Sequence, residues 1–212
     1  MNEANNMLKT VAFGAMLVLA ASVAAQEGVK QTERLLKRAE DTRKQIGDTK
    51  AELQKTLETY NTLVSGRAGD AKKLYNDLRK AADRCEKKRE DVRKRSADME
   101  QEAHTFFEEW TASLAGINNE DLKKRSQTRL NDTRVSFGEI LTAGRRAAAD
   151  FDLFMAALRD QIVYLGYDLN PGAVASLAED AKKLNAQANT MLKSIDAVTT
   201  SIEESMSAIK AR

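Results

Sequence analysis

The chain has very few of the residues that build metal sites, disulfides and tight turns. It contains one histidine (His104), one cysteine (Cys85) and one proline (Pro171) in 212 residues. A single cysteine excludes a disulfide within the chain, and zinc and haem-attachment motifs need cysteines that are missing. A carboxylate-bridged metal site in a helical bundle needs two Glu-x-x-His motifs, and residue 101 is Gln. We therefore expect no metal and no other cofactor.

Motifs for nucleotide binding and nucleophilic catalysis are also missing. Residues 66–72, GRAGDAK, have glycines and a lysine but lack the Gly-Lys-Ser/Thr ending of a phosphate-binding loop. No Gly-x-Ser-x-Gly motif occurs. We therefore expect a protein that is not an enzyme, and the sequence assigns no catalytic or cofactor-binding residue.

Helix-forming apolar and charged residues dominate what remains. Aromatic residues make up 5% of the chain and charged residues 31%, a composition typical of long helices. Apolar residues recur every three or four positions, most regularly over 174–209. This spacing places them in one seam along a helix, as in coiled coils. Cys85 lies in such a seam, and we expect it to be a small core residue. The sequence predicts an all-α fold.

Three short segments interrupt the periodic pattern, at 65–70, 116–119 and 170–172. Gly66 suits the left-handed end of a helix, and Asp70, Asn119 and Asn170 suit the residue before a helix. The predicted helices span about 29–64, 70–115, 120–169 and 171–208. Because short connections force neighbouring helices to run antiparallel, we expect a long antiparallel four-helix bundle or coiled coil.

The predicted bundle is uneven along its length. Large apolar residues gather at its two ends, whereas its middle receives small or polar residues: Thr42, Thr49, Cys85, Lys88, Arg95, Gly144 and Ala147. In one interpretation, which we favour, the small residues let the helices approach closely. In the other, the middle is a hinge or a hydrated cavity.

The first 25 residues differ from the rest. A polar segment is followed by an apolar run at 11–25, and Val23-Ala24-Ala25 before Gln26 fits a leader cleavage site. The run is shorter than the about 20 residues that cross a bilayer. We expect a signal peptide at 1–25, a mature helical bundle at 26–212 without a transmembrane span, and a secreted or periplasmic location. Retention of the leader as an anchor is the alternative.

Basic residues are concentrated within 72–95. We define the basic stripe as Lys87, Lys88, Arg89, Arg93, Lys94 and Arg95. In one interpretation the stripe binds an anionic polymer or lipid surface. In the other, it is a solvated helix face paired with acids of the first helix, such as Glu40, Asp41 and Asp48. Nucleic acid is not expected as a partner of an exported protein.

Three segments carry a resemblance to a known family. They are VKQTERLLKRAEDTRKQ at 29–45, FFEEWTASL at 106–114 and MAALRDQIVYLGYDLNPGAVASL at 155–177. From Glu27 onward the chain resembles a family of uncharacterised exported bacterial coiled-coil proteins, known only as a domain of unknown function. The resemblance implies export and a helical bundle, and it implies no activity, cofactor or catalytic residue.

These observations favour a structural or interaction protein of the cell envelope. Its expected partner is another envelope protein or a second copy of the chain. The alternative is a holdase-like periplasmic chaperone, or a binder of anionic envelope polymers or lipids.

Overall fold

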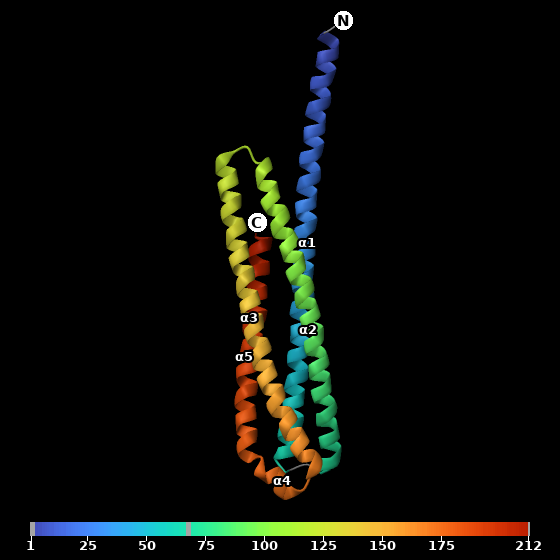
Figure 1. Cartoon of the computed structure of the whole chain (residues 1–212), viewed down its shortest axis with the longest axis vertical. Coiled ribbons are helices and arrows are strands. Elements are labelled where there is room, and N and C mark those ends of the chain that lie inside the picture. Colours follow the sequence, from blue (N-terminus) through green and yellow to red (C-terminus); the bar gives the residue numbers. More distant parts are fainter. Residues whose placement is uncertain (1–2, 67–68, 212) are drawn as a thin grey trace.

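The fold is an antiparallel bundle of long helices (Figure 1). The computed structural model describes residues 3–66 and 69–211, with side chains from residue 27 onward. The elements in chain order are α1 (Glu3–Val64), α2 (Ala71–Ser113), the 3-10 helix η1 (Leu114–Gly116), α3 (Glu120–Tyr167), α4 (Pro171–Ser176) and α5 (Ala178–Lys210). The predicted all-α, antiparallel four-helix architecture is therefore confirmed.

The helix ends form where the sequence predicts them. The side chains of Asp70, Asn119 and Asn170 each accept a hydrogen bond from the backbone amide three residues later, at 2.9, 3.0 and 2.9 Å. Each bond satisfies an amide that has no partner within its own helix. Gly66 follows α1 with a φ of 69°, a conformation that glycine adopts without steric cost.

Two predicted helix boundaries are wrong. The first helix begins at Glu3 instead of near residue 29, because no proline or strong break separates the apolar run from the first seam. The fourth helix, predicted as one piece over 171–208, is divided at Leu177 into α4 and α5. Among the described residues, no helix is both long and apolar enough to cross a membrane. Cleavage of residues 1–25 stays a prediction.

The division at Leu177 closes one end of the bundle. The Leu177 amide donates to the Val174 carbonyl at 3.2 Å, a tight turn that changes the direction of the chain. As a result α4 lies at the bundle end beside the connection between α1 and α2 (Figure 1). Ala173, Val174 and Leu177 are all buried there. Leu177 is apolar because it is buried at the bundle end. The periodic pattern of apolar residues therefore continues through Leu177, although the helix is interrupted there.

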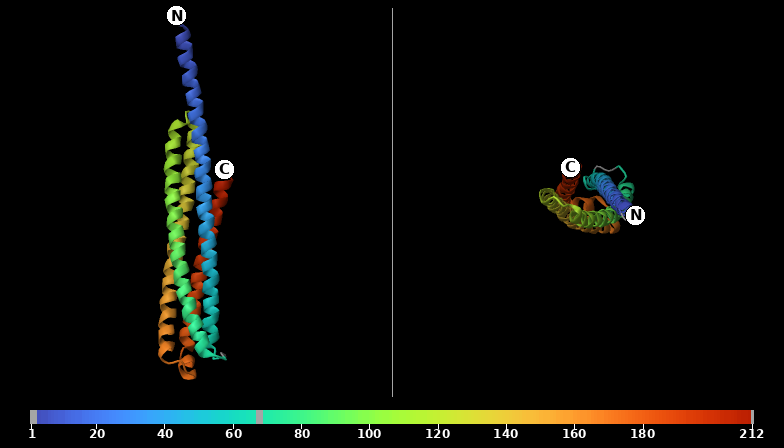
Figure 2. Two further views of the ribbon diagram at one scale, coloured as in Figure 1. Left: turned by 90° about the vertical axis from the view of Figure 1, so that its right-hand side faces the viewer. Right: turned by 90° about the horizontal axis from the view of Figure 1, so that it is seen from above.

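The four long helices follow one another around the bundle axis in the order α1, α2, α3 and α5 (Figure 2). The interfaces α1–α2 and α3–α5 are extensive, whereas α2–α3 and α1–α5 are smaller. The bundle is therefore two closely packed helix pairs that meet along two weaker seams.

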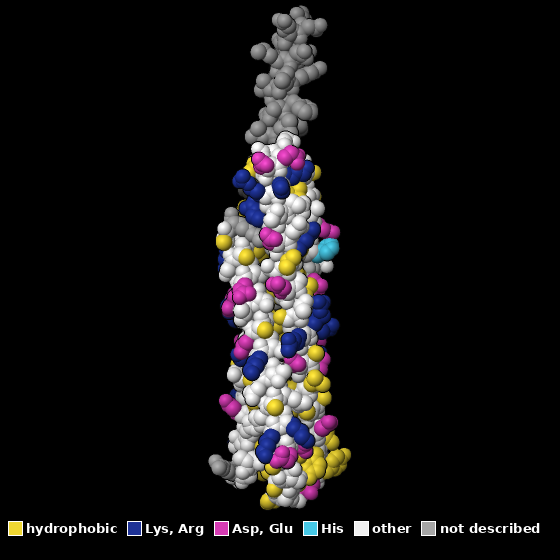
Figure 3. All heavy atoms as spheres, turned by 90° about the vertical axis from the view of Figure 1, so that its left-hand side faces the viewer, with side chains coloured by type: hydrophobic (Ala, Val, Ile, Leu, Met, Phe, Trp, Pro, Cys, Tyr) yellow, Lys and Arg dark blue, Asp and Glu magenta, His cyan; other side chains and the backbone are white. Residues whose placement is uncertain are grey.

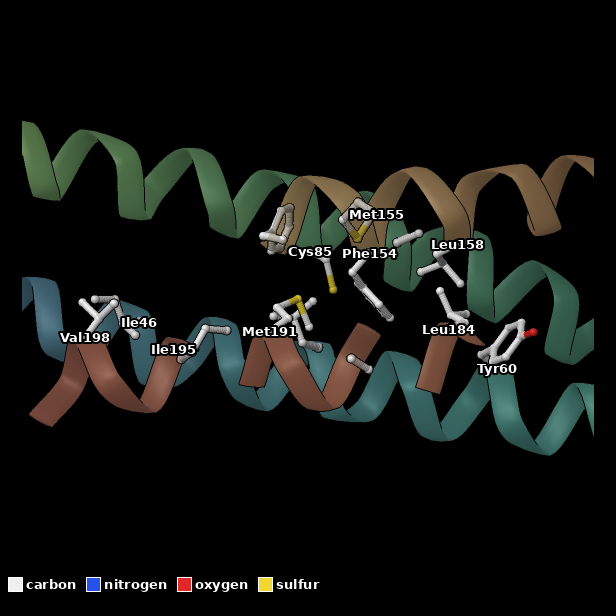
Figure 4. Packing of buried hydrophobic residues seen from close by; sticks show 14 of the residues in the cluster. Ile46, Tyr60, Cys85, Phe154, Met155, Leu158, Leu184, Met191, Ile195 and Val198 are labelled. Carbon is white, nitrogen blue, oxygen red and sulfur yellow. The ribbon is translucent and has the colours of Figure 1, made fainter. Parts of the chain in front are cut away.

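Large buried side chains fill the end closed by α4. Tyr60, Leu158 and Leu184 are fully buried, and in Figure 4 Leu158 and Leu184 point toward one another with Tyr60 beside them. The Tyr60 hydroxyl donates a hydrogen bond to the buried Gln161 side chain of α3. On the outer surface charges of both signs are interspersed, and apolar side chains gather near this same end (Figure 3).

The opposite end holds an aromatic cluster. The Phe106 and Trp110 rings meet edge to face with centroids 5.5 Å apart. The Trp110 indole nitrogen donates to the Ser126 hydroxyl of α3 at 2.9 Å, which ties α2 to α3 beside the connection between them. The two ends of the bundle are thus fixed by large side chains, as their sequence positions suggest.

Candidate functional site

A cavity of about 450 Å³ lies in the middle of the bundle. Its inner wall comes from α1 and α5, and every side chain of this wall is buried: Thr42, Ile46, Thr49, Ile195, Val198 and Ile202. We call this space the waist cavity. In Figure 4, Ile46, Ile195 and Val198 lie along the part of α1 and α5 that forms this wall.

The waist cavity opens between α2 and α3. The exposed residues among its lining are Arg93, Ala97 and Glu100 on α2 and Arg145 and Ala148 on α3. The lining residues of α1 and α5 are buried without exception. The opening therefore lies along one of the two weaker seams, and the closely packed pairs α1–α2 and α3–α5 form its sides.

Small side chains on α3 explain why the space is not filled. Gly144 and Ala147 line the cavity, and a Cβ atom added at Gly144 would meet no atom within 4 Å. The neighbouring helices leave this room unfilled. Of the two interpretations of the middle segment, the structure supports the cavity. Thr42, Thr49, Gly144 and Ala147 line it, whereas Cys85, Lys88 and Arg95 do not.

The inner wall presents an apolar surface even at its two threonines, Thr42 and Thr49. The Thr49 hydroxyl donates to the Gln45 carbonyl at 2.8 Å, and the Thr42 hydroxyl donates to the Arg38 carbonyl at 2.8 Å. Because both hydroxyl protons are used by backbone carbonyls, which for Thr42 include the Arg95 carbonyl of α2 at 3.2 Å, these residues offer no free donor to the cavity. Together with the isoleucines and Val198 they form a hydrocarbon-like surface.

Arg89 is fixed at one end of the opening. Its Nη2 atom lies 2.7 Å from the carboxylate of Asp152 on α3, and its guanidinium carbon lies 5.6 Å from the centre of the Phe151 ring. The Nε atom is buried and has no hydrogen-bond partner in the described structure. The side chain is thus held on two sides while one of its donors stays unused.

The basic stripe divides into two groups. Arg89 and Arg93 line the waist cavity, and both are ion-paired: Arg89 with Asp152 and Arg93 with Glu90 of its own helix at 2.8 Å. The hydrogen bond from Arg93 lowers the pKa of Glu90. The other four residues form no ion pair within the described part of the chain: Lys87, Lys88, Lys94 and Arg95.

The acidic residues of α1 that were expected to neutralise the basic stripe do not pair with it. Glu40 pairs with Arg43 at 2.7 Å on its own helix, and neither Asp41 nor Asp48 forms an ion pair in the described structure. The predicted pairing with the first helix is therefore wrong. The seam between α1 and α2 does contain ion pairs, but they involve other residues: Arg84 with Glu52 at 2.7 Å, Arg38 with Asp98 at 3.6 Å and Arg34 with Glu102 at 3.6 Å.

Cys85 and His104 stand apart from the cavity. Cys85 is fully buried, 3.2 Å from the Thr56 hydroxyl, and burial raises the pKa of its thiol to about 11. This supports the expectation of a core residue. His104 is exposed, with its Nδ1 atom 3.3 Å from the Glu108 carboxylate. The described residues include no cluster of three or more potential His, Cys, Asp or Glu metal ligands.

Arg145 is a cavity residue that the sequence analysis did not single out. It directly follows Gly144 and belongs to no run of basic residues longer than Arg145-Arg146. Its position at the opening depends on the register between α2 and α3, because antiparallel packing places it across from the segment that carries Arg93. The adjacent Gly144, in the middle of a long periodic segment, is the one local feature of the sequence that indicates open space beside Arg145.

One comparison with known proteins gives a match. A family model described as "Protein of unknown function (DUF2959)" matches residues 22–211. No curated protein and no solved structure matches the chain.

Proposed function

We propose that this chain, which belongs to the DUF2959 family of proteins of unknown function, is a non-catalytic binding protein of the cell envelope that acts through its waist cavity. The observation that carries the proposal is the cavity itself, about 450 Å³, with an apolar inner wall and an opening to the surface. Small-molecule sites commonly have volumes of about 300–1,000 Å³.

The cost of leaving such a space open supports binding. Protein interiors are packed as densely as organic crystals and contain few voids larger than a water molecule. Water inside a cavity needs about two to four polar partners, and the threonine hydroxyls of this wall already donate to their own helix. An apolar ligand restores the missing van der Waals contacts without needing those partners.

The envelope location rests on the sequence. The apolar run at 11–25 and the small residues before Gln26 support export and cleavage. Amino-terminal sequencing of the protein recovered from cells tests this part of the proposal, with Gln26 as the expected first residue. Protein in the cytosol that still begins with Met1 contradicts it.

The binding part can be tested with a neutral apolar fluorophore, N-phenylnaphthylamine. We expect its fluorescence to rise in a saturable way on titration with the full chain. Gly144→Leu should abolish the rise, because the new side chain enters the cavity. Gly138→Leu is the matched control, since Gly138 lies on the same helix, outside the cavity lining, with equal room for a Cβ. Equal fluorescence in both variants contradicts the proposal.

A second candidate function has its own support in the structure. Four cations of the basic stripe, Lys87, Lys88, Lys94 and Arg95, lack ion pairs within the described residues. They suit an anionic lipid surface or envelope polymer. Salt-sensitive retention on anionic vesicles, lost when Lys87, Lys94 and Arg95 are all replaced by Glu, supports this function. Retention that persists in this variant contradicts it.

A holdase-like chaperone would use the same cavity for an unfolded segment of another protein. Suppression of the aggregation of unfolded outer-membrane proteins distinguishes this activity from small-molecule binding. It should depend on Gly144 in the same way as fluorophore binding.

A further inference from the structure

We infer that the waist cavity binds a fatty acid, with the alkyl chain along the inner wall and the carboxylate at the arginines of the opening. The inference deepens the proposed function, because it rests on the cavity being a binding site and adds the chemical class of the ligand. Its elements are the shape of the cavity, the charge at its opening and the unused donor of Arg89.

The cavity is elongated along the bundle axis. Its lining residues extend on α2 from Arg89 to Glu100 and on α3 from Ile140 to Phe151. At a rise of 1.5 Å per residue each segment is roughly 16 Å long. On α5 the lining runs from Ile195 to Ile202, roughly 10 Å. A space of this length with a hydrocarbon-like wall suits an extended alkyl chain better than a compact ring system.

The side chains that line the opening are mainly cationic, and Asp152 and Glu90 outside the lining neutralise two of them. Three arginines line it, Arg89, Arg93 and Arg145, against one carboxylate, Glu100. Glu100 lies three helical turns from Arg89 along α2, at the far end of the cavity. Arg145, which forms no ion pair among the described residues, carries the positive charge that favours an anionic over a cationic head group at the opening.

Arg89 supplies the most specific argument. Its Nη2 atom is engaged by Asp152 and its position is fixed against Phe151, yet its buried Nε–H has no acceptor in the described structure. A buried donor without a partner destabilises a fold by about 1–3 kcal/mol. The Arg89 side chain as a whole is 37% exposed at the opening, and a guanidinium is well matched in shape to a carboxylate.

Arg93 and Arg145 are able to join this contact. Arg93 is exposed and, among the described residues, pairs only with Glu90. Exposed pairs of this kind contribute about 0–1 kcal/mol, so exchange for a ligand carboxylate costs little. Arg145 donates only a long 3.4 Å hydrogen bond to Thr142 in the described structure. Both side chains are long enough to follow a head group at the edge of the cavity.

The test compares two ligands of equal chain length in displacing N-phenylnaphthylamine from the full chain, below their micelle-forming concentrations. Palmitate should displace the fluorophore at a concentration at least about tenfold lower than hexadecanol, as expected for a hydrogen bond to a charged group. Arg89→Gln should remove most of this preference.

Two further variants keep the test informative. Arg84→Gln is the matched control, because Arg84 lies on the same helix and is ion-paired with Glu52 but does not line the cavity. It should leave the preference for palmitate intact. Arg145→Gln should also reduce the preference for palmitate. Because Arg145 is exposed and has no role in the core, this variant keeps the test valid even if Arg89→Gln unfolds the protein.

The possible results distinguish failure of the fatty-acid inference from failure of the proposed binding function. If palmitate and hexadecanol displace the fluorophore equally, or if hexadecylamine is preferred, the fatty-acid inference is wrong while the cavity remains a binding site. If Gly144→Leu and Gly138→Leu bind the fluorophore as the natural chain does, the proposed function itself is wrong. A preference for palmitate that depends on Arg89 and Arg145 supports both.

Discussion

The closed end and the waist of this bundle are built from the same four helices and the same periodic pattern, yet they pack differently. At the closed end Tyr60, Leu158 and Leu184 are each 0% exposed and fill the space between the helices. At the waist the seam positions include Thr49 and Gly144, and a cavity of about 450 Å³ remains. The spacing of apolar residues decides which face of a helix turns inward. The volume of the residues decides whether that face packs.

The two regions have different roles: the closed end stabilises the bundle, and the waist holds the cavity. Large buried side chains fill the closed end, whereas small residues at the waist leave an opening unfilled. A cavity of this kind is stable only when stabilising contacts elsewhere outweigh the contacts it lacks. The predictions that follow compare matched positions in the two regions.

The largest difference is expected between two isoleucines. Ile162 and Ile195 are almost equally buried, 4% and 6% exposed, but only Ile195 lines the cavity. Ile162→Ala should lower the free energy of unfolding by about 2–5 kcal/mol, the range for a closely packed aliphatic side chain. Ile195→Ala should cost clearly less, because part of the side chain faces empty space. Urea unfolding measures both, and equal losses contradict the comparison.

Filling the waist should stabilise the protein. Gly144→Leu and Gly138→Leu both gain about 1 kcal/mol from the better helix propensity of leucine. Gly144→Leu should gain more, up to the about 1.5–3 kcal/mol of a buried leucine side chain, because the space around its Cβ is open and lined by apolar groups. The same urea experiment applies. A Gly144→Leu variant that is no more stable than Gly138→Leu shows that the waist closes in solution.

Polar groups in the two regions should also respond differently. Tyr60→Phe removes the donor to the buried Gln161 side chain and should cost about 1–3 kcal/mol, because the amide oxygen is left without a partner. Thr49→Val at the waist should lower the free energy of unfolding by less than about 1 kcal/mol. The Gln45 carbonyl loses the threonine hydroxyl but keeps its backbone hydrogen bond within the helix. Thermal unfolding distinguishes the two, and a larger loss for Thr49→Val contradicts the expectation.

The smallest effect at neutral pH concerns Cys85, which lies between the two regions. Burial raises the pKa of its thiol to about 11, whereas an unfolded thiol ionises near about 8.5. Since the unfolded chain loses the proton first, stability should be constant below about pH 8.5. It should then fall by at most about 1.4 kcal/mol per pH unit up to about pH 11.

Cys85→Ala should remove this part of the pH dependence and cost much less than Ile162→Ala at neutral pH. Burial also raises the pKa of Tyr60, so a decline at higher pH should remain in both proteins. Fast labelling of Cys85 by a thiol reagent in the folded protein at pH 7 contradicts this prediction, because it would place the thiol in contact with water.

Much of the fold follows from local sequence. The caps at Asp70, Asn119 and Asn170 and the left-handed Gly66 depend on residues within a few positions of each break, so they are predictable from the chain alone. The break at Leu177 is not, because the residue fits the periodic pattern and only burial beneath α4 redirects it.

The site was predictable in part. Thr42, Thr49, Gly144 and Ala147 were placed at the middle by counting from the turns, and all four line the cavity. The contribution of Arg145 and the pairing of Arg89 with Asp152 were not predicted. Both depend on the register between α2 and α3, which no local pattern specifies.

The sequence by itself determined that the chain forms long helices, where they are capped and which face of each turns inward, because these properties depend on residues within one or two helical turns. Tertiary structure alone decided that the small residues of the waist leave an open cavity instead of allowing close approach. It also decided which seam that cavity opens through and which arginines stand at its opening. The physical reason is that the separation and register of the helices depend on side chains from all four helices, far along the chain from the waist residues whose surroundings they control.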